Sequence, residues 1–94
     1  MALKWTRAAT RHRISRDRSQ YVIEHSGIRF EQYPPAGSSD VADLRYIYLG
    51  DDPFGTPLEV IAVELNEGDL LVIHAMKLRK RYEEQYERAR KWRR

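Results

Sequence analysis

The sequence has no cysteine and no long apolar run. Without cysteine, neither a disulfide nor a thiolate metal site can support the fold, and we expect a reducing, cytoplasmic location. The opening MALKWTRAATRHR lacks the apolar core of a secretory signal, and no stretch approaches the roughly 20 apolar residues of a membrane span. We therefore expect one small soluble domain over residues 1–94, with no membrane partner.

Several catalytic signatures are also missing. The chain contains no glycine-rich phosphate loop and no Ser-His-Asp pattern. The adjacent carboxylates of Asp51-Asp52 and Glu83-Glu84 would point in different directions on a strand or a helix, and the segment HRISRDR lacks the spacing of metal ligands. We assign no metal and no cofactor to this sequence.

Charge is divided unevenly along the chain. Residues 1–29 carry seven Lys/Arg and two Asp/Glu, residues 30–76 carry one and nine, and residues 77–94 carry nine and three, which gives net charges of +5, −8 and +6. If the two basic ends lie side by side in the fold, they form a cationic face suited to a phosphate backbone. Two ordinary solvated helix faces would explain the same charges equally well.

Capping residues and periodicity predict two helices near the N-terminus. The segment KWTRAATRHRI suits a short helix, and Ser15 is a good N-cap for a second helix, which Gly27 would end in a left-handed conformation. A short strand is predicted over residues 27–33. The proline, glycine and serine content of residues 34–43 predicts a loop.

The rest of the chain reads as a sheet followed by a helix. Further strands are predicted over residues 44–50, 58–65 and 69–76. In the last two strands the apolar residues occupy both odd and even positions, so both faces of each strand should be buried and the strands should lie centrally in the sheet. A tight hairpin in which Gly68 supplies a positive φ should join them. Apolar residues recur at helical spacing from Leu78 onward, with Tyr82 and Tyr86 in the buried stripe. The sequence thus predicts an α+β domain in which N-terminal helices pack on a roughly four-stranded antiparallel sheet, followed by a C-terminal helix.

Three short motifs occur in an order that resembles a known family. They are RHRIS at residues 11–15, RYIYLG at residues 45–50 and VIHAMKLRKRYEE at residues 72–84. Together they resemble BrnT-type toxins, small relatives of the RelE/ParE group in bacterial type II toxin–antitoxin systems, although Arg13 stands where that family usually has glycine. The resemblance implies a toxin that inhibits translation by cleaving RNA. It also implies a cognate antitoxin, which can mediate oligomerisation. Trp92 lies near the chain end and is therefore a better candidate for an exposed antitoxin contact than Tyr82 or Tyr86.

RNA cleavage by internal attack of the 2′-hydroxyl needs a base, cations beside the phosphorane and preferably an acid for the leaving oxygen. Suitable side chains lie where the last strand ends and the helix begins. The residues predicted to be catalytic, in a metal-independent endoribonuclease, are His74, Lys77, Arg79, Arg81 and Tyr82. The residues predicted to bind RNA are Arg11, His12, Arg13, Arg45 and Lys80.

These candidates also have structural explanations. In a regular strand His74 shares its face with Leu70 and Val72, so a core histidine is at least as consistent with the pattern as a catalytic base. Lys77 would then point to the opposite face. The consecutive cations of residues 79–81 cannot all face one ligand from a helix. The alternative function is therefore a non-catalytic protein of the same fold that binds RNA or only the antitoxin.

Overall fold

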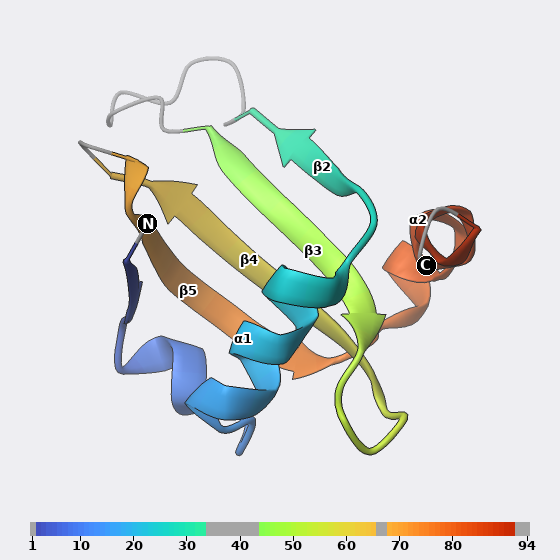
Figure 1. Cartoon of the computed structure of the whole chain (residues 1–94), viewed down its shortest axis with the longest axis horizontal. Coiled ribbons are helices and arrows are strands. Elements are labelled where there is room, and N and C mark those ends of the chain that lie inside the picture. The colour runs from blue at the N-terminus through green and yellow to red at the C-terminus, as the bar shows by residue number, and fades with distance from the viewer. Residues whose placement is uncertain (1, 34–43, 66–67, 92–94) are drawn as a thin grey trace.

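The computed structural model describes residues 2–33, 44–65 and 68–91. The elements in chain order are β1 (Leu3–Trp5), the 3₁₀ turn η1 (Ala8–Thr10), α1 (Arg16–His25), β2 (Arg29–Gln32), β3 (Arg45–Asp51), β4 (Pro57–Glu64), β5 (Leu70–Lys77), the 3₁₀ turn η3 (Lys80–Tyr82) and α2 (Glu83–Arg90). The strands form one five-stranded sheet in the order β1-β5-β4-β3-β2 (Figure 1). The predicted loop over residues 34–43, part of the predicted hairpin at residues 66–69, and Trp92 lie outside the described residues.

The α+β class is confirmed, but the sheet differs from the prediction. It has five strands and is mixed, because β1 pairs in parallel with β5 while the other neighbours pair antiparallel. The predicted first helix is wrong: Lys4 and Trp5 pair with Leu71 and Val72 in the sheet, and only Ala8–Thr10 form a helical turn. A three-residue strand is too short for alternation to show, and its partner lies near the other end of the chain.

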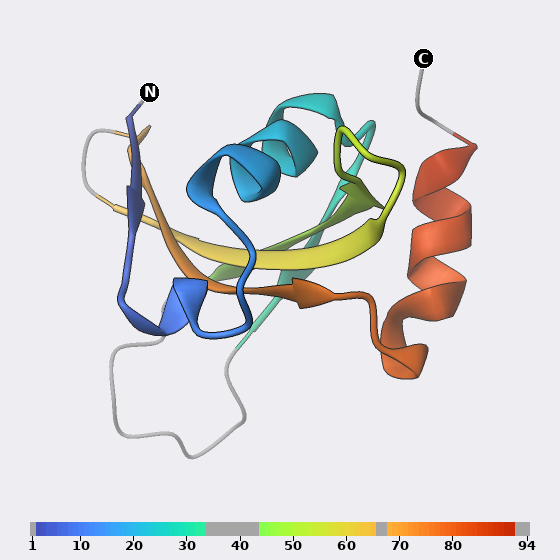
Figure 2. The ribbon, with the colours of Figure 1, turned by 90° about the horizontal axis from the view of Figure 1, so that it is seen from below.

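Helix α1 begins as predicted and ends differently. The Ser15 hydroxyl accepts a hydrogen bond from the Arg18 backbone N–H at 3.2 Å, as an N-cap should. Gly27 does not adopt a left-handed conformation. The helix instead ends at Ser26, which has φ −72° and ψ 131° and whose backbone N–H donates to the Val22 carbonyl at 2.9 Å. Figure 2 shows α1 lying across one face of the sheet.

The central strands are apolar on both faces because each face packs against other elements over at least part of its area. One face packs against α1 and η1 through residues such as Leu58 and Val60. The opposite face contributes Ile47, Leu49 and Ile61, which pack against Tyr82 and Tyr86 from η3 and α2. Helix α2 stands at one end of the sheet (Figure 2), so among the described elements no helix covers the remainder of this second face.

Other predictions for this half of the chain are confirmed. Strand β4 lies between β3 and β5, and β5 lies between β4 and β1, so both are central. Gly68 has a φ of +82°. The C-terminal helix is present with Tyr82 and Tyr86 buried. It begins later than Leu78, because Arg79 is extended, with φ −92° and ψ 155°.

A bulge between β4 and β5 determines where His74 points. Ala62 pairs with Val72 and Ile61 pairs with His74, so Ile73 is an extra residue on β5. Val72 packs in the α1-side core, whereas Ile61 and Ile73 belong to the opposite face. Directly paired residues share a face, which places His74 beside Ile61. The expectation that His74 shares the face of Val72 is therefore wrong, since one inserted residue shifts the alternation.

Candidate functional site

A buried carboxylate that the sequence reasoning missed lies at the centre of the site. Glu59 is fully buried on β4. Its Oε2 accepts hydrogen bonds from His74 Nε2 at 2.9 Å and from Arg79 Nε and Nη2 at 2.9 and 2.6 Å, and its Oε1 accepts from the Arg79 backbone N–H at 2.8 Å. A buried charge needs such partners. A single glutamate inside an apolar central strand is the sequence signal that could have revealed the network.

These contacts set the protonation states of Glu59 and His74. Burial acts to raise the pKa of the Glu59 carboxyl, but hydrogen bonds from Arg79 and His74 outweigh it and lower the pKa. Burial lowers the pKa of His74 below its ordinary 6.5, and the bond to Glu59 only partly opposes this shift. His74 is therefore neutral at pH 7. Because an ionised carboxylate can only accept, the imidazole proton is on Nε2 and the Nδ1 lone pair is free to take a proton.

An open pocket of about 430 Å³ lies in front of this pair. Ile61 and Ile73 line it together with polar side chains from β2, β3, β5 and η3. The pocket brings together five residues that were predicted from the sequence, namely Arg45, His74, Arg79, Arg81 and Tyr82. Gln32 also lines the pocket and was not predicted. An apolar surface beside three guanidinium groups thus surrounds a neutral histidine.

Tyr82 contributes a ring surface to this pocket. The residue is buried, and the guanidinium carbons of Arg79 and Arg81 lie 5.7 and 5.0 Å from its ring centroid. A cation over an aromatic face is attracted by the ring quadrupole. The ring therefore helps to hold two guanidinium groups at the rim of the pocket.

The other predicted residues lie mainly in a neighbouring hollow, which we call the second hollow. It has a volume of about 360 Å³ and is lined by Arg11, His12, Arg13, Met76 and Lys77. The rings of His12 and His74 meet edge to face with centroids 5.8 Å apart, so the two hollows adjoin. Lys77 pairs with Leu58 of the α1-side core, which places it on the face opposite His74. Lys80 is exposed and lines neither hollow.

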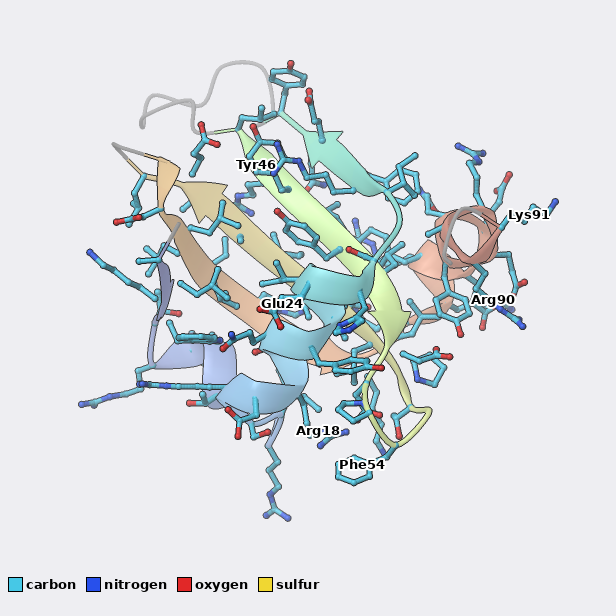
Figure 3. The ribbon with its side chains drawn as sticks, in the orientation of Figure 1. Arg18, Glu24, Tyr46, Phe54, Arg90 and Lys91 are labelled. Atoms are coloured by element: carbon cyan, nitrogen blue, oxygen red, sulfur yellow. The ribbon has the colours of Figure 1, made fainter. Side chains whose placement is uncertain are left out.

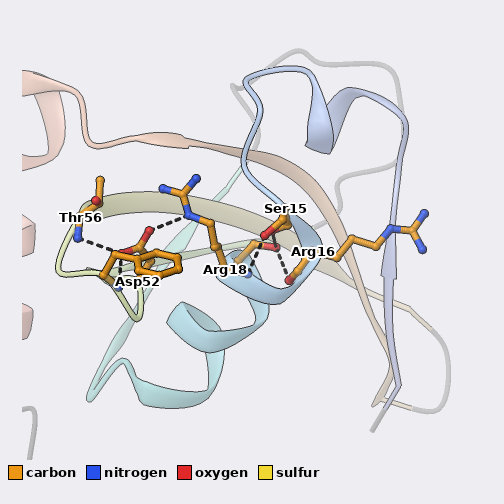
Figure 4. A network of polar contacts seen from close by, with 7 residues as sticks. Ser15, Arg16, Arg18, Asp52 and Thr56 are labelled. Carbon is orange, nitrogen blue, oxygen red and sulfur yellow. Dashed lines mark hydrogen bonds and ion pairs between the residues drawn. The ribbon is translucent and has the colours of Figure 1, made fainter.

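A further buried carboxylate, Asp52, has a structural role. Its side chain accepts hydrogen bonds from Arg18 Nε at 2.6 Å and from the backbone N–H groups of Phe54 and Thr56 at 2.9 Å (Figure 4). Burial acts to raise the pKa of Asp52, but these bonds lower it. Figure 3 shows Arg18 and Phe54 at the same end of the molecule. Asp52 therefore fastens the β3–β4 hairpin to α1.

Comparisons with protein-family models, curated proteins and solved structures gave no match. In the described part of the chain, no helix is long and apolar enough to cross a membrane. Within the same residues, no three His, Asp or Glu side chains converge as a metal-ion site would require. The functional argument therefore rests on the two hollows and their residues.

Proposed function

We propose that this protein is the toxin of a toxin–antitoxin pair and acts in the cytoplasm as an endoribonuclease that inhibits translation. The pocket in front of Glu59 and His74 is its active site. The observation that supports this most directly is the hydrogen bond from His74 to Glu59, because it holds a neutral imidazole with a free Nδ1 beside three arginines. A base near neutrality and cations near a developing negative charge are what phosphodiester cleavage needs.

His74 acts as the general base in this mechanism. Its Nδ1 takes the proton of a ribose 2′-hydroxyl, whose oxygen attacks the adjacent phosphorus. The bond from phosphorus to the 5′-oxygen breaks, and the leaving oxygen takes a proton from water. The products are a 2′,3′-cyclic phosphate and a 5′-hydroxyl. The Glu59 carboxylate fixes the orientation of the imidazole and stabilises the imidazolium that forms, as the carboxylate of a catalytic triad does.

The remaining pocket residues suit the other parts of an RNA nucleotide. Arg45, Arg79 and Arg81 line one pocket and can donate hydrogen bonds to phosphate oxygens. Ile61 and Ile73 offer an apolar surface to the face of a base. Arg79 has a second role, because two of its side-chain nitrogens already donate to Glu59. Arg45 and Arg81 are therefore the cations with more freedom to follow the substrate.

The test compares His74→Gln with His25→Gln. Glutamine at position 74 can still donate a hydrogen bond to Glu59 but cannot act as a base, whereas His25 lies on the exposed end of α1. Purified wild type should cleave a labelled single-stranded RNA with unchanged rate in EDTA and leave the matching DNA intact. His74→Gln should lose about 100-fold or more in rate, and His25→Gln should retain it. Equal activity of the two variants would contradict the assignment of the base.

A second candidate function uses the same pocket without catalysis. The pocket combines cations with an apolar surface, which also suits an acidic peptide carrying an apolar anchor, such as an antitoxin segment. In that case the wild-type protein binds RNA or the antitoxin but releases no cyclic phosphate product. Growth arrest on expression that persists in His74→Gln would favour this second function.

A further inference from the structure

The second hollow has the composition of an anion-binding site. It is lined by Arg11, Arg13 and Lys77 together with His12 and Met76, and it has no acidic lining residue. Among the described residues, none of the three long cationic side chains forms an ion pair, whereas Arg79 in the neighbouring pocket is paired with Glu59. Cations gathered without a counter-charge repel one another, and a bound anion relieves that repulsion.

The backbone of this segment is strained at one of these cations. Arg13 has a φ of 63°, and no other non-glycine residue in the described ranges has a positive φ. This conformation is unfavourable for a residue with a side chain and costs glycine nothing. Strain of this kind persists where the surrounding structure enforces it, often at functional sites. Here the turn that follows η1 carries Arg11 and Arg13 to the same hollow as Lys77.

The second hollow also lies beside the proposed active site. Figure 2 shows the segment after η1 passing close to β5. His12 lines the second hollow and His74 lines the proposed active site, so the contact between their rings joins the two hollows. The cations of the second hollow therefore lie next to the pocket in which His74 would meet its substrate.

We propose that Arg11, Arg13 and Lys77 form a second phosphate subsite, which binds the phosphate next to the scissile one on the same RNA strand. This inference rests on the proposed function for the identity of its ligand. It makes the substrate a strand that continues beyond the cleaved linkage, and a dinucleotide without a flanking phosphate is a poor substrate. His12, between the two subsites, contacts the nucleotide that joins them.

Binding of a non-cleavable RNA tests the subsite independently of catalysis. The probe is a fluorescent single-stranded oligonucleotide whose 2′-hydroxyls are methylated, titrated by anisotropy at several salt concentrations. Arg13→Gly should bind about 5- to 20-fold more weakly, and its plot of log affinity against log salt should be shallower by about 0.7, the loss of one phosphate contact. Its thermal midpoint should not fall, because glycine relieves the strain. Lys4→Ala, which removes one exposed charge on β1 outside the hollow, should leave the salt slope unchanged.

A neutral linkage in the probe assigns the contact to a particular phosphate. Replacing one flanking phosphate by a methylphosphonate should weaken binding to the wild type about as much as Arg13→Gly does, and should have little further effect on that variant. The subsite would be overturned if the neutral linkage weakened binding equally in the wild type and in Arg13→Gly at every flanking position. It would also be overturned if Lys4→Ala changed the salt slope as much as Arg13→Gly does.

These outcomes separate the subsite from the proposed activity. If the wild type shows this binding pattern but cleaves no RNA, the subsite stands and the proposed catalysis fails. If the wild type cleaves RNA while Arg13→Gly and Lys77→Ala bind the probe as tightly as it does, the activity stands and the subsite fails. Absence of any RNA binding at low salt would overturn the subsite.

Discussion

Replacing Glu59 by glutamine disturbs the centre of the site with little change in volume. The carboxylate accepts four hydrogen bonds, one from His74 and three from Arg79. In the variant, the glutamine carbonyl oxygen has two lone pairs and can accept about two hydrogen bonds. The amide nitrogen is itself a donor and cannot accept any. At least two of the four bonds are therefore lost. Hydrogen bonds to a charged group contribute about 1.5–3 kcal/mol each. The Arg79 side chain is 39% exposed, so water can replace Glu59 as its hydrogen-bond partner, and the lower value of about 1.5 kcal/mol per bond applies.

The expected loss is therefore about 3 kcal/mol in the free energy of unfolding, which agrees with the roughly 3–5 kcal/mol for breaking a buried ion pair. A domain of this size tolerates such a loss if its stability lies in the ordinary range of about 5–15 kcal/mol. Urea denaturation followed by circular dichroism measures the change. Glu64→Gln is the matched control, since Glu64 is exposed on the same strand and should change stability by no more than about 0.5 kcal/mol.

The same variant changes the chemistry of His74. Loss of the carboxylate removes the interaction that raises the pKa of His74, so this pKa falls further. The imidazole is also no longer held with its proton on Nε2, and ring ¹⁵N chemical shifts report that tautomer directly. A loss of stability below about 0.5 kcal/mol, or a His74 tautomer that is unchanged in Glu59→Gln, would refute the role given to the buried carboxylate.

Two further predictions concern pH and the hairpin. The pKa of His74 is lower in the folded state, so below pH 6.5 the unfolded chain binds a proton that the folded chain does not. The free energy of unfolding should therefore fall as the pH drops below 6.5. Urea midpoints measured between pH 5 and 8 should show this dependence in the wild type and lose it in His74→Gln. The lowered pKa values of Glu59 and Asp52 add a separate decline as pH falls below their ordinary values, because stability present when they are ionised is lost on protonation. Asp52→Asn should lower the free energy of unfolding by about 1.5–3 kcal/mol, because it weakens the hydrogen bonds to Arg18 and to the hairpin backbone. An unchanged thermal midpoint in this variant would contradict the role of Asp52 in holding the hairpin against α1.

Local chemistry was sufficient to predict most of the elements. Ser15 caps α1 and Gly68 supplies a positive φ, since both depend on residues that are close in sequence. Strands β3, β4 and β5 were predicted, and for β4 and β5 the apolar residues at successive positions also predicted burial on both faces. Strand β1 was not, because three residues carry no period and only pairing with β5 makes them a strand. Non-local pairing was the information that the pattern lacked.

The site was predicted in part for a similar reason. The cations at the end of β5 and in the following turn are close in sequence, so their proximity is visible without a fold. Glu59 comes from β4, and its partners His74 and Arg79 lie on the next strand and beyond it. Gln32 comes from β2 at the far side of the sheet. Both became recognisable only once the strand order was known.

The bulge at Ile73 explains how the apolar core strand β5 can lead directly into a polar, cationic pocket. In a regular strand the neighbours Ile73 and His74 would point to opposite faces, and only one of them could enter the pocket. The inserted residue lets both line it, Ile73 as part of the apolar surface and His74 as the base bonded to Glu59. Ala75 then returns to the core beneath α1. One irregular pair thus places an apolar contact and a proton acceptor side by side while β5 remains a central strand.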